Sequence, residues 1–544
     1  MTHPKLNLAR RLGLALVLLP WSLASQAANP ALEPAVQRAV APVPVGNTAS
    51  TLPEGWHKGA FAEIFVRGYR DSNGDGIGDL RGLTQSLDYL KALGVRGIWL
   101  MPISPSQDRD HGYSVSDYRD IEPAYGTLAD FDELLRQAHA RGLGVIIDYV
   151  INHSAADNPV FLESARSPGS PLRNWYMWKS PGPAGWSIYD RNPWEATPNG
   201  SYLAQFNKNM PDFNLLEPAV VAFHKDNLRF WLNRGVDGFR FDAVPHLVEH
   251  GPDAWYDQPE DHGLMDQFRA VVDGYSHRYV VCEATGNMHK YAASDVCGSA
   301  FAIWRAGDIV GAARGEVKHI RRVADYFLGA PQQMATMISN HDSFAGDRLW
   351  DQLKGDVARQ RLAAAGYLLQ PGTPFIFYGE EIGMAAAAEL KHDPKLRIPM
   401  SWTAEPKTAG FSTATPFRPV SANASTQNVA AEQARSDGIL AWYRALLALR
   451  NSYPSLSRGS YDAPSVQGKA IAFRRHFNGE TALVLINYGD KPARFKLRGI
   501  GVKPWKPVFP KTDGTSWTAD AKGRHGLELP AQSVQVWIES ASRP

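Results

Sequence analysis

The chain has 544 residues, 44% hydrophobic and 21% charged, with 47 Gly and 38 Pro, which argues against disorder along its whole length, a coiled coil or a disulfide-knotted miniprotein. Its 57 Lys and Arg against 55 Asp and Glu give a net charge of +2, too balanced for a protein that binds nucleic acid. Sixteen Trp and 20 Tyr suit a partner that stacks on aromatic rings, as sugars do, although core packing could also account for them.

Residues 1–27 have the pattern of a secretory signal peptide. The basic residues Lys5, Arg10 and Arg11 precede an apolar stretch at 12–24 and the small-x-small site Ser25-Gln26-Ala27, which predicts cleavage after Ala27. The alternative is an uncleaved membrane anchor, but about 13 apolar residues are too few to span a bilayer. We therefore expect an exported protein, periplasmic or extracellular, with no membrane attachment after cleavage. Residues 28–54, rich in Ala, Pro and Val, are predicted to be a linker.

From about residue 55 to 450, short apolar strands alternate with amphipathic helices. One helix places Leu at 83, 87, 90 and 93 and ends at Gly94, and another begins at the N-cap Thr127. The predicted strands are 62–66, 97–101, 145–150, 238–242, 279–282, 335–338 and 374–377. This alternation predicts a parallel sheet, either open or closed into a barrel.

Two regions depart from the alternation. Residues 154–214 are rich in Pro, Gly, Trp and Asn and too long for an ordinary loop, so they are predicted to form an inserted lobe. After residue 450 the pattern becomes β, and Asn478-Gly479 between apolar runs predicts a hairpin. The last 95 or so residues are therefore expected to form a small antiparallel β-sandwich.

Polar residues follow the predicted strands at the end where barrel enzymes place their active sites. Arg240 and Asp242 lie two apart on a strand and therefore share a face, where the guanidinium would keep the carboxylate ionised, as a nucleophile requires. Glu283 follows the apolar residues 280–282, and desolvation should raise its pKa toward that of a general acid. One charged and one protonated carboxyl group predict glycoside cleavage.

The ordered motifs GIWLMPISPS, HGYSVSDY, DYVINH, MPDFN, GFRFDAVPH, VVCEA, ISNHD and GTPFIFYGEE resemble the α-amylase family, glycoside hydrolase family 13, from about Ala62 to the C-terminus. The resemblance implies an α/β fold, a (β/α)8 TIM barrel formed by residues 55–153 and 215–450. Domain B would be inserted after strand 3, at 154–214. The C-terminal antiparallel β-sandwich, domain C, would occupy 451–544.

The resemblance also implies the roles of individual residues. Asp242 matches the nucleophile, Glu283 the acid/base and Asp342 the carboxylate that stabilises the transition state. Asp148 matches the aspartate that supports Arg240. The predicted substrate-binding residues are Tyr113, which matches the aromatic platform, together with His111, His153, Arg240, His246 and His341.

The loop DSNGDGIGDL, residues 71–80, spaces oxygen ligands as calcium requires, although Gly82 at the twelfth position excludes an EF-hand. The alternative is a solvated Asp/Gly turn. The resemblance strengthens the prediction of a structural Ca²⁺ and adds the carbonyl of Ile77, so that the predicted ligands are Asp71, Asn73, Asp75, Ile77 and Asp79. A second calcium beneath domain B, through Asn152, stays open.

The predicted function is that of a retaining α-amylase, cleaving internal α-1,4 bonds of starch, dextrins and maltooligosaccharides. Ser114, where exo-acting relatives usually carry Asp, favours this interpretation, as do His111 and His246. The alternative is an α-glucosidase, cyclomaltodextrinase or transglycosylase, which the RIPMSW stretch at 397–402 favours. A non-catalytic subunit on the same fold is less consistent with three retained carboxylates. We expect a monomer, and whether Cys282 and Cys297 form a disulfide is left open.

Overall fold

The computed structural model describes residues 32–46, 49–511 and 516–539, so the predicted signal peptide lies outside the described residues. Within them, parallel strands close into a barrel in the order β1-β11-β10-β9-β8-β7-β3-β2, which confirms the predicted TIM barrel. The strands are β1 (Phe61–Ile64), β2 (Gly97–Leu100), β3 (Gly144–Tyr149), β7 (Gly238–Phe241), β8 (Tyr279–Cys282), β9 (Ala300–Phe301), β10 (Met334–Thr336) and β11 (Thr373–Phe377). One of them, β9, escaped prediction because two residues carry no periodic pattern.

Aromatic rings fill the interior of the barrel. Phe61 stacks on Phe375 at 4.8 Å between ring centroids, and Trp99 packs against Phe301 at 5.5 Å. Gly97 begins its strand beside them, and a Cβ atom there would lie 2.3 Å from the Phe61 ring. Aromatic packing therefore fills this part of the barrel, which leaves no open channel through it.

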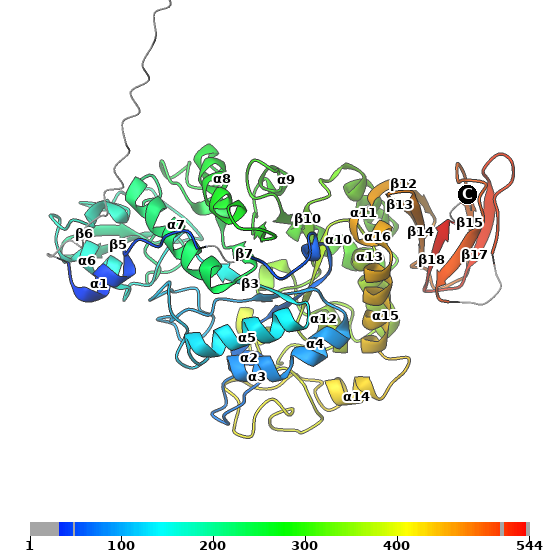
Figure 1. Ribbon diagram of the computed structural model, residues 1–544, viewed down its shortest axis with the longest axis horizontal. Helices are drawn as coiled ribbons and strands as arrows, with labels where there is room; N and C mark the ends of the chain where they lie inside the picture. Colours follow the sequence, from blue (N-terminus) through cyan, green and yellow to red (C-terminus); the bar gives the residue numbers. More distant parts are fainter. Residues whose placement is uncertain (1–31, 47–48, 512–515, 540–544) are drawn as a thin grey trace, which may run out of the picture.

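Helices surround the barrel (Figure 1). The capping box of Thr127 and Asp130 and the left-handed Gly94 occur where the sequence predicts them. In the described part of the chain, no helix has the length and apolar character needed to cross a membrane. The main helices are α3 (Leu80–Gln85), α4 (Leu87–Leu93), α5 (Leu128–Ala140), α7 (Pro218–Arg234), α8 (Pro259–Asp273), α10 (Ala306–Ala313), α11 (Val317–Gly329), α13 (Val357–Leu368) and α15 (Ile439–Ser452). Shorter helices are α2 (Val66–Tyr69), α9 (Met288–Tyr291), α12 (Leu349–Gln352), α14 (Val429–Gln433) and α16 (Pro454–Arg458).

The interval between β3 and α7 forms a lobe of its own at one end of the molecule (Figure 1). It holds α6 (Pro159–Arg166) and an antiparallel sheet in the order β4-β6-β5. These strands are β4 (Trp178–Lys179), β5 (Trp194–Thr197) and β6 (Gly200–Leu203). A bridge between His153 and Asp212 joins the beginning of the lobe to its end, so the lobe returns to the barrel rim where it left.

The range predicted as a linker contains structure. Helix α1 (Pro34–Ala39) lies beside α6 in Figure 1, and Val36 is buried. Arg119 donates a 2.7 Å hydrogen bond to the carbonyl of Ala41. Apolar burial and this backbone contact hold the segment against the barrel although its sequence has no periodicity.

The C-terminal region is antiparallel. One sheet has the order β12-β13-β14-β18-β16, and β15 pairs with β17. Asn478 and Gly479 both adopt positive φ between β13 and β14, which confirms the predicted hairpin. The strands are β12 (Ser460–Gln467), β13 (Ala470–Phe477), β14 (Glu480–Asn487), β15 (Ala493–Leu497), β16 (Trp505–Phe509), β17 (His525–Leu529) and β18 (Ser533–Glu539). The structure also joins Cys282 and Cys297 in a disulfide.

Candidate active site

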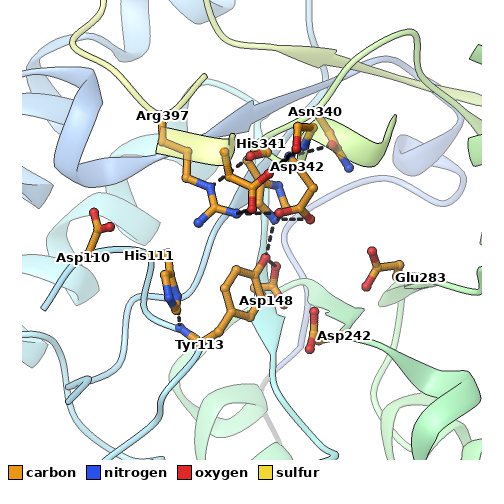
Figure 2. A network of polar contacts seen from close by, with 12 residues as sticks. Asp110, His111, Tyr113, Asp148, Asp242, Glu283, Asn340, His341, Asp342 and Arg397 are labelled. Atoms are coloured by element: carbon orange, nitrogen blue, oxygen red, sulfur yellow. Dashed lines mark hydrogen bonds and ion pairs between the residues drawn. The ribbon is translucent and has the colours of Figure 1, made fainter. Parts of the chain in front are cut away.

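The ends of β3, β7, β8 and β10 bring the predicted carboxylates to one rim of the barrel (Figure 2). Arg240 stands at the centre of this group, with 1% of its side chain exposed. Its Nη1 lies 2.9 Å from Asp148 Oδ1 and 2.6 Å from Asp242 Oδ1, and its Nη2 lies 2.9 Å from Glu283 Oε2. One guanidinium therefore orients three carboxylates, including both that the sequence assigns to bond cleavage.

Glu283 has the environment of a proton donor. Burial, together with the nearby charges of Asp242 and Asp342, raises its pKa to about 7 against the opposing effect of Arg240. Its Oε2 also accepts a 3.0 Å hydrogen bond from the backbone N–H of Ala243. Ala243 adopts φ +47°, a conformation that a residue with a Cβ adopts at a cost and that directs this N–H toward the glutamate. The elevated pKa agrees with the expectation from the sequence.

Asp342 lies in a chain of charges that crosses the barrel rim. His341 places Nδ1 2.6 Å from Glu63 Oε1 and Nε2 3.0 Å from Asp342 Oδ2. Burial would lower the pKa of His341, but Asp342 and Glu63 raise it to about 10, so the imidazole is protonated at neutral pH. Burial would raise the pKa of Asp342, but His341 and Arg397 hold it well below its ordinary value.

Two members of this chain of charges were not assigned a role from the sequence. Glu63 is fully buried inside the barrel in β1, and a carboxylate in the middle of an apolar strand was the signal that could have found it. Arg397 places Nη2 2.5 Å from Asp342 Oδ1 and donates from Nε to the carbonyl of His341 at 2.9 Å. Only the fold brings Arg397 here, because 54 residues separate it from Asp342.

Arg397 continues into a second ion pair. Arg418 donates from Nη1 to the carbonyl of Arg397 at 2.8 Å, and its Nη2 lies 2.5 Å from Asp110 Oδ2. Figure 2 shows Arg397, Asp110 and His111 on the side of the site that faces away from Glu283. We call Arg397, Arg418 and Asp110 the charged wall.

Tyr113 lies between the charged groups. Its hydroxyl donates to Asp148 Oδ2 at 3.0 Å, and its ring stacks on His341 with an interplanar angle of 14°. The Nε2 of His153 lies 3.2 Å from the carbonyl of Tyr113, and burial lowers the pKa of His153 to about 4, so this ring is neutral. The predicted platform and one predicted histidine are thus held together.

The other two predicted histidines, His111 and His246, contact the loop of Tyr113 and the inserted lobe. The backbone N–H of Tyr113 donates to His111 Nδ1 at 3.1 Å. His246 contacts the inserted lobe, with Nδ1 3.0 Å from Gln205 Oε1 and Nε2 3.3 Å from the hydroxyl of Tyr189. Burial lowers the pKa of His246 to about 3, so this ring is also neutral.

In the predicted calcium loop, side-chain oxygens accept hydrogen bonds from the loop's own backbone N–H groups. Asp71 Oδ1 accepts from the N–H groups of Asn73 and Gly74 at 2.9 and 2.7 Å. Asp79 caps α3 by accepting from Gly82 N–H at 2.7 Å. Within residues 32–46, 49–511 and 516–539, no three His, Cys, Asp or Glu side chains form a group that could hold a metal ion. Calcium in this loop therefore stays a prediction.

Beneath the inserted lobe lies a buried polar cluster that includes Asn152. Asn152 Nδ2 donates to Asp212 Oδ1 at 3.0 Å, whereas Asn152 Oδ1 is buried without a hydrogen-bond partner in the described part of the chain. Gln205 donates its backbone N–H to Asp212 Oδ2 at 3.0 Å and its side-chain amide to Glu249. Two buried carboxylates and an unpartnered amide oxygen are the donor types that calcium prefers.

Comparisons with known proteins agree on the fold and the family. The family described as "Alpha amylase, catalytic domain" matches residues 63–459. "Alpha-amylase 3" of Dictyoglomus thermophilum is 34% identical over 80% of this chain and 85% of its own length, and the "Probable alpha-glucosidase" of Rhizobium meliloti is 31% identical over 90% and 98%. The crystal structure of the alpha-glucosyl transfer enzyme XgtA superposes with a TM-score of 0.76 at 28% identity, covering 90% of this chain and all of XgtA.

Proposed function

The chain belongs to the α-amylase family of glycosidases, and from that premise we propose that it releases and transfers single glucosyl units from the non-reducing ends of α-glucosides. It would thus be an α-glucosidase with transglycosylase activity. This is the alternative weighed from the sequence, and the names of the relatives and the charged wall support it at least as well as internal cleavage.

The charged wall is the observation that carries the proposal. The reacting sugar has to lie between Asp242, Glu283 and Asp342, with its leaving group on the side of Glu283. On the opposite side, Arg397 and Asp110 present charged donors and acceptors (Figure 2). Hydroxyls of a terminal sugar can bind such groups, whereas an internal sugar needs that side open for the rest of its chain.

The sequence argument for internal cleavage uses Ser114 together with His111 and His246, and the structure weakens the part that depends on Ser114. Ser114 is buried, and its carbonyl accepts a 2.8 Å hydrogen bond from Ser106 within its own loop. Ser114 is therefore packed within this loop, with 2% of its surface exposed. Asp110, which the sequence analysis passed over, lies beside the site instead.

The proposed mechanism retains the anomeric configuration. Asp242 attacks the anomeric carbon while Glu283 protonates the leaving oxygen, and the resulting glucosyl ester is then resolved when Glu283 takes a proton from water or from a sugar hydroxyl. Asp342, held ionised, binds hydroxyls of the distorted sugar. Arg240 fixes both reacting carboxylates through separate nitrogens.

A matched pair of substrates tests the proposal. A p-nitrophenyl maltoheptaoside with a free non-reducing end should be shortened one glucose at a time, and the same compound blocked at that end should resist cleavage. Products analysed by chromatography distinguish the outcomes. Rapid cleavage of the blocked compound into mixed oligomers would overturn the proposal and support an α-amylase, as the 34%-identical relative is named.

Calcium is proposed at both positions that the sequence indicates. Asp71, Asn73 and Asp75 carry side-chain oxygens around one turn, and the carbonyl of Ile77 adds a further donor. The cluster of Asn152, Asp212 and Glu249 fits a second ion, because the unpartnered Oδ1 of Asn152 needs a cation or a donor.

Export is also proposed. The disulfide between Cys282 and Cys297 supports an oxidising compartment. Sequencing of the N-terminus of the protein recovered from periplasm or medium should find it beginning at Ala28, and a start at Met1 would contradict signal cleavage.

A further inference from the structure

The end of β8 has the shortest backbone pairing in the barrel. Within the described part of the chain, β8 and β9 share one residue pair in register, Cys282 with Ala300, whereas every other pair of neighbouring barrel strands shares two or more. The reason is that β9 has only two residues. The barrel wall is therefore least held by its backbone next to the residue that follows Cys282, which is Glu283.

A disulfide lies at this junction. Cys282 is the last residue of β8, and its partner Cys297 lies just before β9, so the bond joins the two strands where their pairing is shortest. Both cysteine side chains are fully buried, and the carbonyl of Cys297 accepts a 2.8 Å hydrogen bond from Arg269 Nη1 in α8. The bond therefore connects β8 to the helix layer as well as to β9.

The disulfide closes a ring of chain, residues 283–296, whose first residue is Glu283. Most of residues 287–290 in the middle of this ring are exposed, and few buried contacts hold an exposed segment in place. Near its start, the hydroxyl of Thr285 accepts a 3.0 Å hydrogen bond from Tyr256. The covalent bond is the connection that limits how far the two ends of the ring can separate.

We propose that the Cys282–Cys297 disulfide positions the proton donor by fixing the end of β8, which holds Glu283 beside Arg240. The inference rests on the proposed function, because it needs Glu283 as the acid. Glu283 Oε2 lies 2.9 Å from Arg240 Nη2 and 3.0 Å from the backbone nitrogen of Ala243, so a shift of about 1 Å at the end of β8 would break both contacts. The cysteines act through Glu283, since Cys282 packs on the outer face of the strand.

The same shift would admit water to Glu283. Burial is the largest cause of the raised pKa of this group, about 7, so greater exposure should lower that pKa. The decline of kcat/KM for maltose then moves to lower pH, because Glu283 loses its proton earlier. The charged and titratable groups that face Glu283 lie outside the ring: Arg240, Asp242, Asp342, Tyr189 and Tyr256.

A double variant, Cys282→Ala with Cys297→Ala, removes the bond. In maltose the leaving oxygen takes a proton from Glu283 as the glycosidic bond breaks. In α-glucosyl fluoride, Asp242 bonds to the anomeric carbon while fluoride leaves with the bonding electrons and needs no proton. In the double variant we expect kcat/KM for maltose at pH 7 to fall about tenfold and that for the fluoride by less than about twofold. The maltose profile from pH 5 to 9 should decline at lower pH than in the wild type.

Two further forms of the protein control for lost packing. Val280→Ala truncates a buried residue on the same face of β8 and leaves the disulfide intact. Wild type treated with dithiothreitol keeps both sulfur atoms as thiols, while the two thiols of the reagent become a disulfide. The reagent should lower kcat/KM for maltose in the wild type and leave that of the double variant unchanged.

Each outcome decides a different statement. Equal losses on the two substrates, or equal losses in the double variant and Val280→Ala, would overturn the positioning role and leave the proposed function intact. A lower Tm with wild-type kinetics and an unchanged pH profile would do the same, because a purely structural disulfide gives that result. Absence of fluoride release from α-glucosyl fluoride by the wild type, or its persistence in Asp242→Asn, would overturn the proposed function itself.

Discussion

Two carboxylates at the same barrel end differ in charge although both are shielded from water. Glu283 exposes 8% of its side chain and Asp342 exposes 18%. The pKa of Glu283 rises to about 7, whereas that of Asp342 falls well below its ordinary value. Burial alone would raise the pKa of both groups, so burial does not explain why the pKa of Asp342 falls.

The cations around each group account for the difference. Glu283 shares the single guanidinium of Arg240 with two other carboxylates, and burial therefore outweighs the attraction. Asp342 contacts His341 and Arg397, two cations that it shares with fewer competitors. In this site the number of cations per carboxylate determines which carboxyl group has a raised pKa and which stays charged.

The largest effect is expected on the half of the site that holds Glu283. Glu283→Gln removes the proton donor, so kcat/KM for maltose should fall by about 10³-fold. Fluoride needs no proton to leave, and the formation of the glucosyl ester from α-glucosyl fluoride should be much less affected. Steady-state assays with the two substrates, and a stopped-flow burst of fluoride, measure the contrast.

The wild type provides the control for this contrast. Its kcat/KM for maltose should decline above pH 7, as Glu283 loses its proton, whereas glucosyl-ester formation from the fluoride should not follow that decline. Equal losses on both substrates in Glu283→Gln would remove Glu283 from its role as acid.

On the other half, Arg397→Ala removes one of the two cations of Asp342. A buried carboxylate left with fewer partners is costly, and a terminal sugar loses a donor, so kcat/KM for maltose should fall by about 10²-fold. Arg418→Ala is the matched control, because Arg418 contacts Asp110 and the Arg397 carbonyl and not Asp342. Similar losses in both variants would mean that the wall acts only as a scaffold.

Glu63→Gln tests the second cation beside Asp342, which is the protonated His341. His341 has a pKa raised to about 10, so its charge and the stability that it contributes are complete below pH 6.5 and are lost as the pH rises through 10. Without the Glu63 carboxylate the pKa of His341 should fall, and kcat/KM for α-glucosyl fluoride at pH 9 should drop about tenfold relative to pH 6.

The pH profile of fluoride release from pH 5 to 10 measures this shift. Glu381→Gln is the control, because Glu381 is a buried glutamate that accepts from the hydroxyl of Tyr89 at 2.7 Å and forms no ion pair with a histidine in the described part of the chain. A wild-type profile in Glu63→Gln would show that Glu63 does not maintain the charge of His341.

The surroundings of Glu283 could be predicted from the sequence, whereas those of Asp342 could not. Local patterns predicted Arg240 beside Asp242 and an apolar lead-in to Glu283, because neighbours on one strand set both features. Glu63, the partner of His341, comes from β1, and Arg397, a partner of Asp342, comes from a segment beyond β11, and no spacing rule connects them. Ion pairs between residues distant in sequence could therefore be identified only from the fold.

The barrel shows the same limit. Seven of the eight barrel strands were found from their apolar runs, and so was the Asn478-Gly479 hairpin, whereas β9 with two residues was not. The pairing of α1 with α6 was missed for a different reason, since Val36 becomes buried only against a partner distant in sequence. Local periodicity predicts elements, and packing decides which isolated apolar residues are covered.

The smallest expected effect concerns two buried carboxylates that form no ion pair within residues 32–46, 49–511 and 516–539. Asp212 and Glu249 are buried, and in the described part of the chain they accept hydrogen bonds from amides and backbone and form no ion pair, in contrast to both halves of the active site. If Ca²⁺ is the missing cation, chelation should lower Tm by about 2–5 °C, because an ion at 100 times its Kd contributes about 2.7 kcal/mol. Asn152→Ala should abolish part of that shift and Asp71→Ala the remainder, which assigns each loss to one site. Differential scanning calorimetry with and without chelator measures it, and an unchanged Tm in the wild type would leave both proposed sites without an ion.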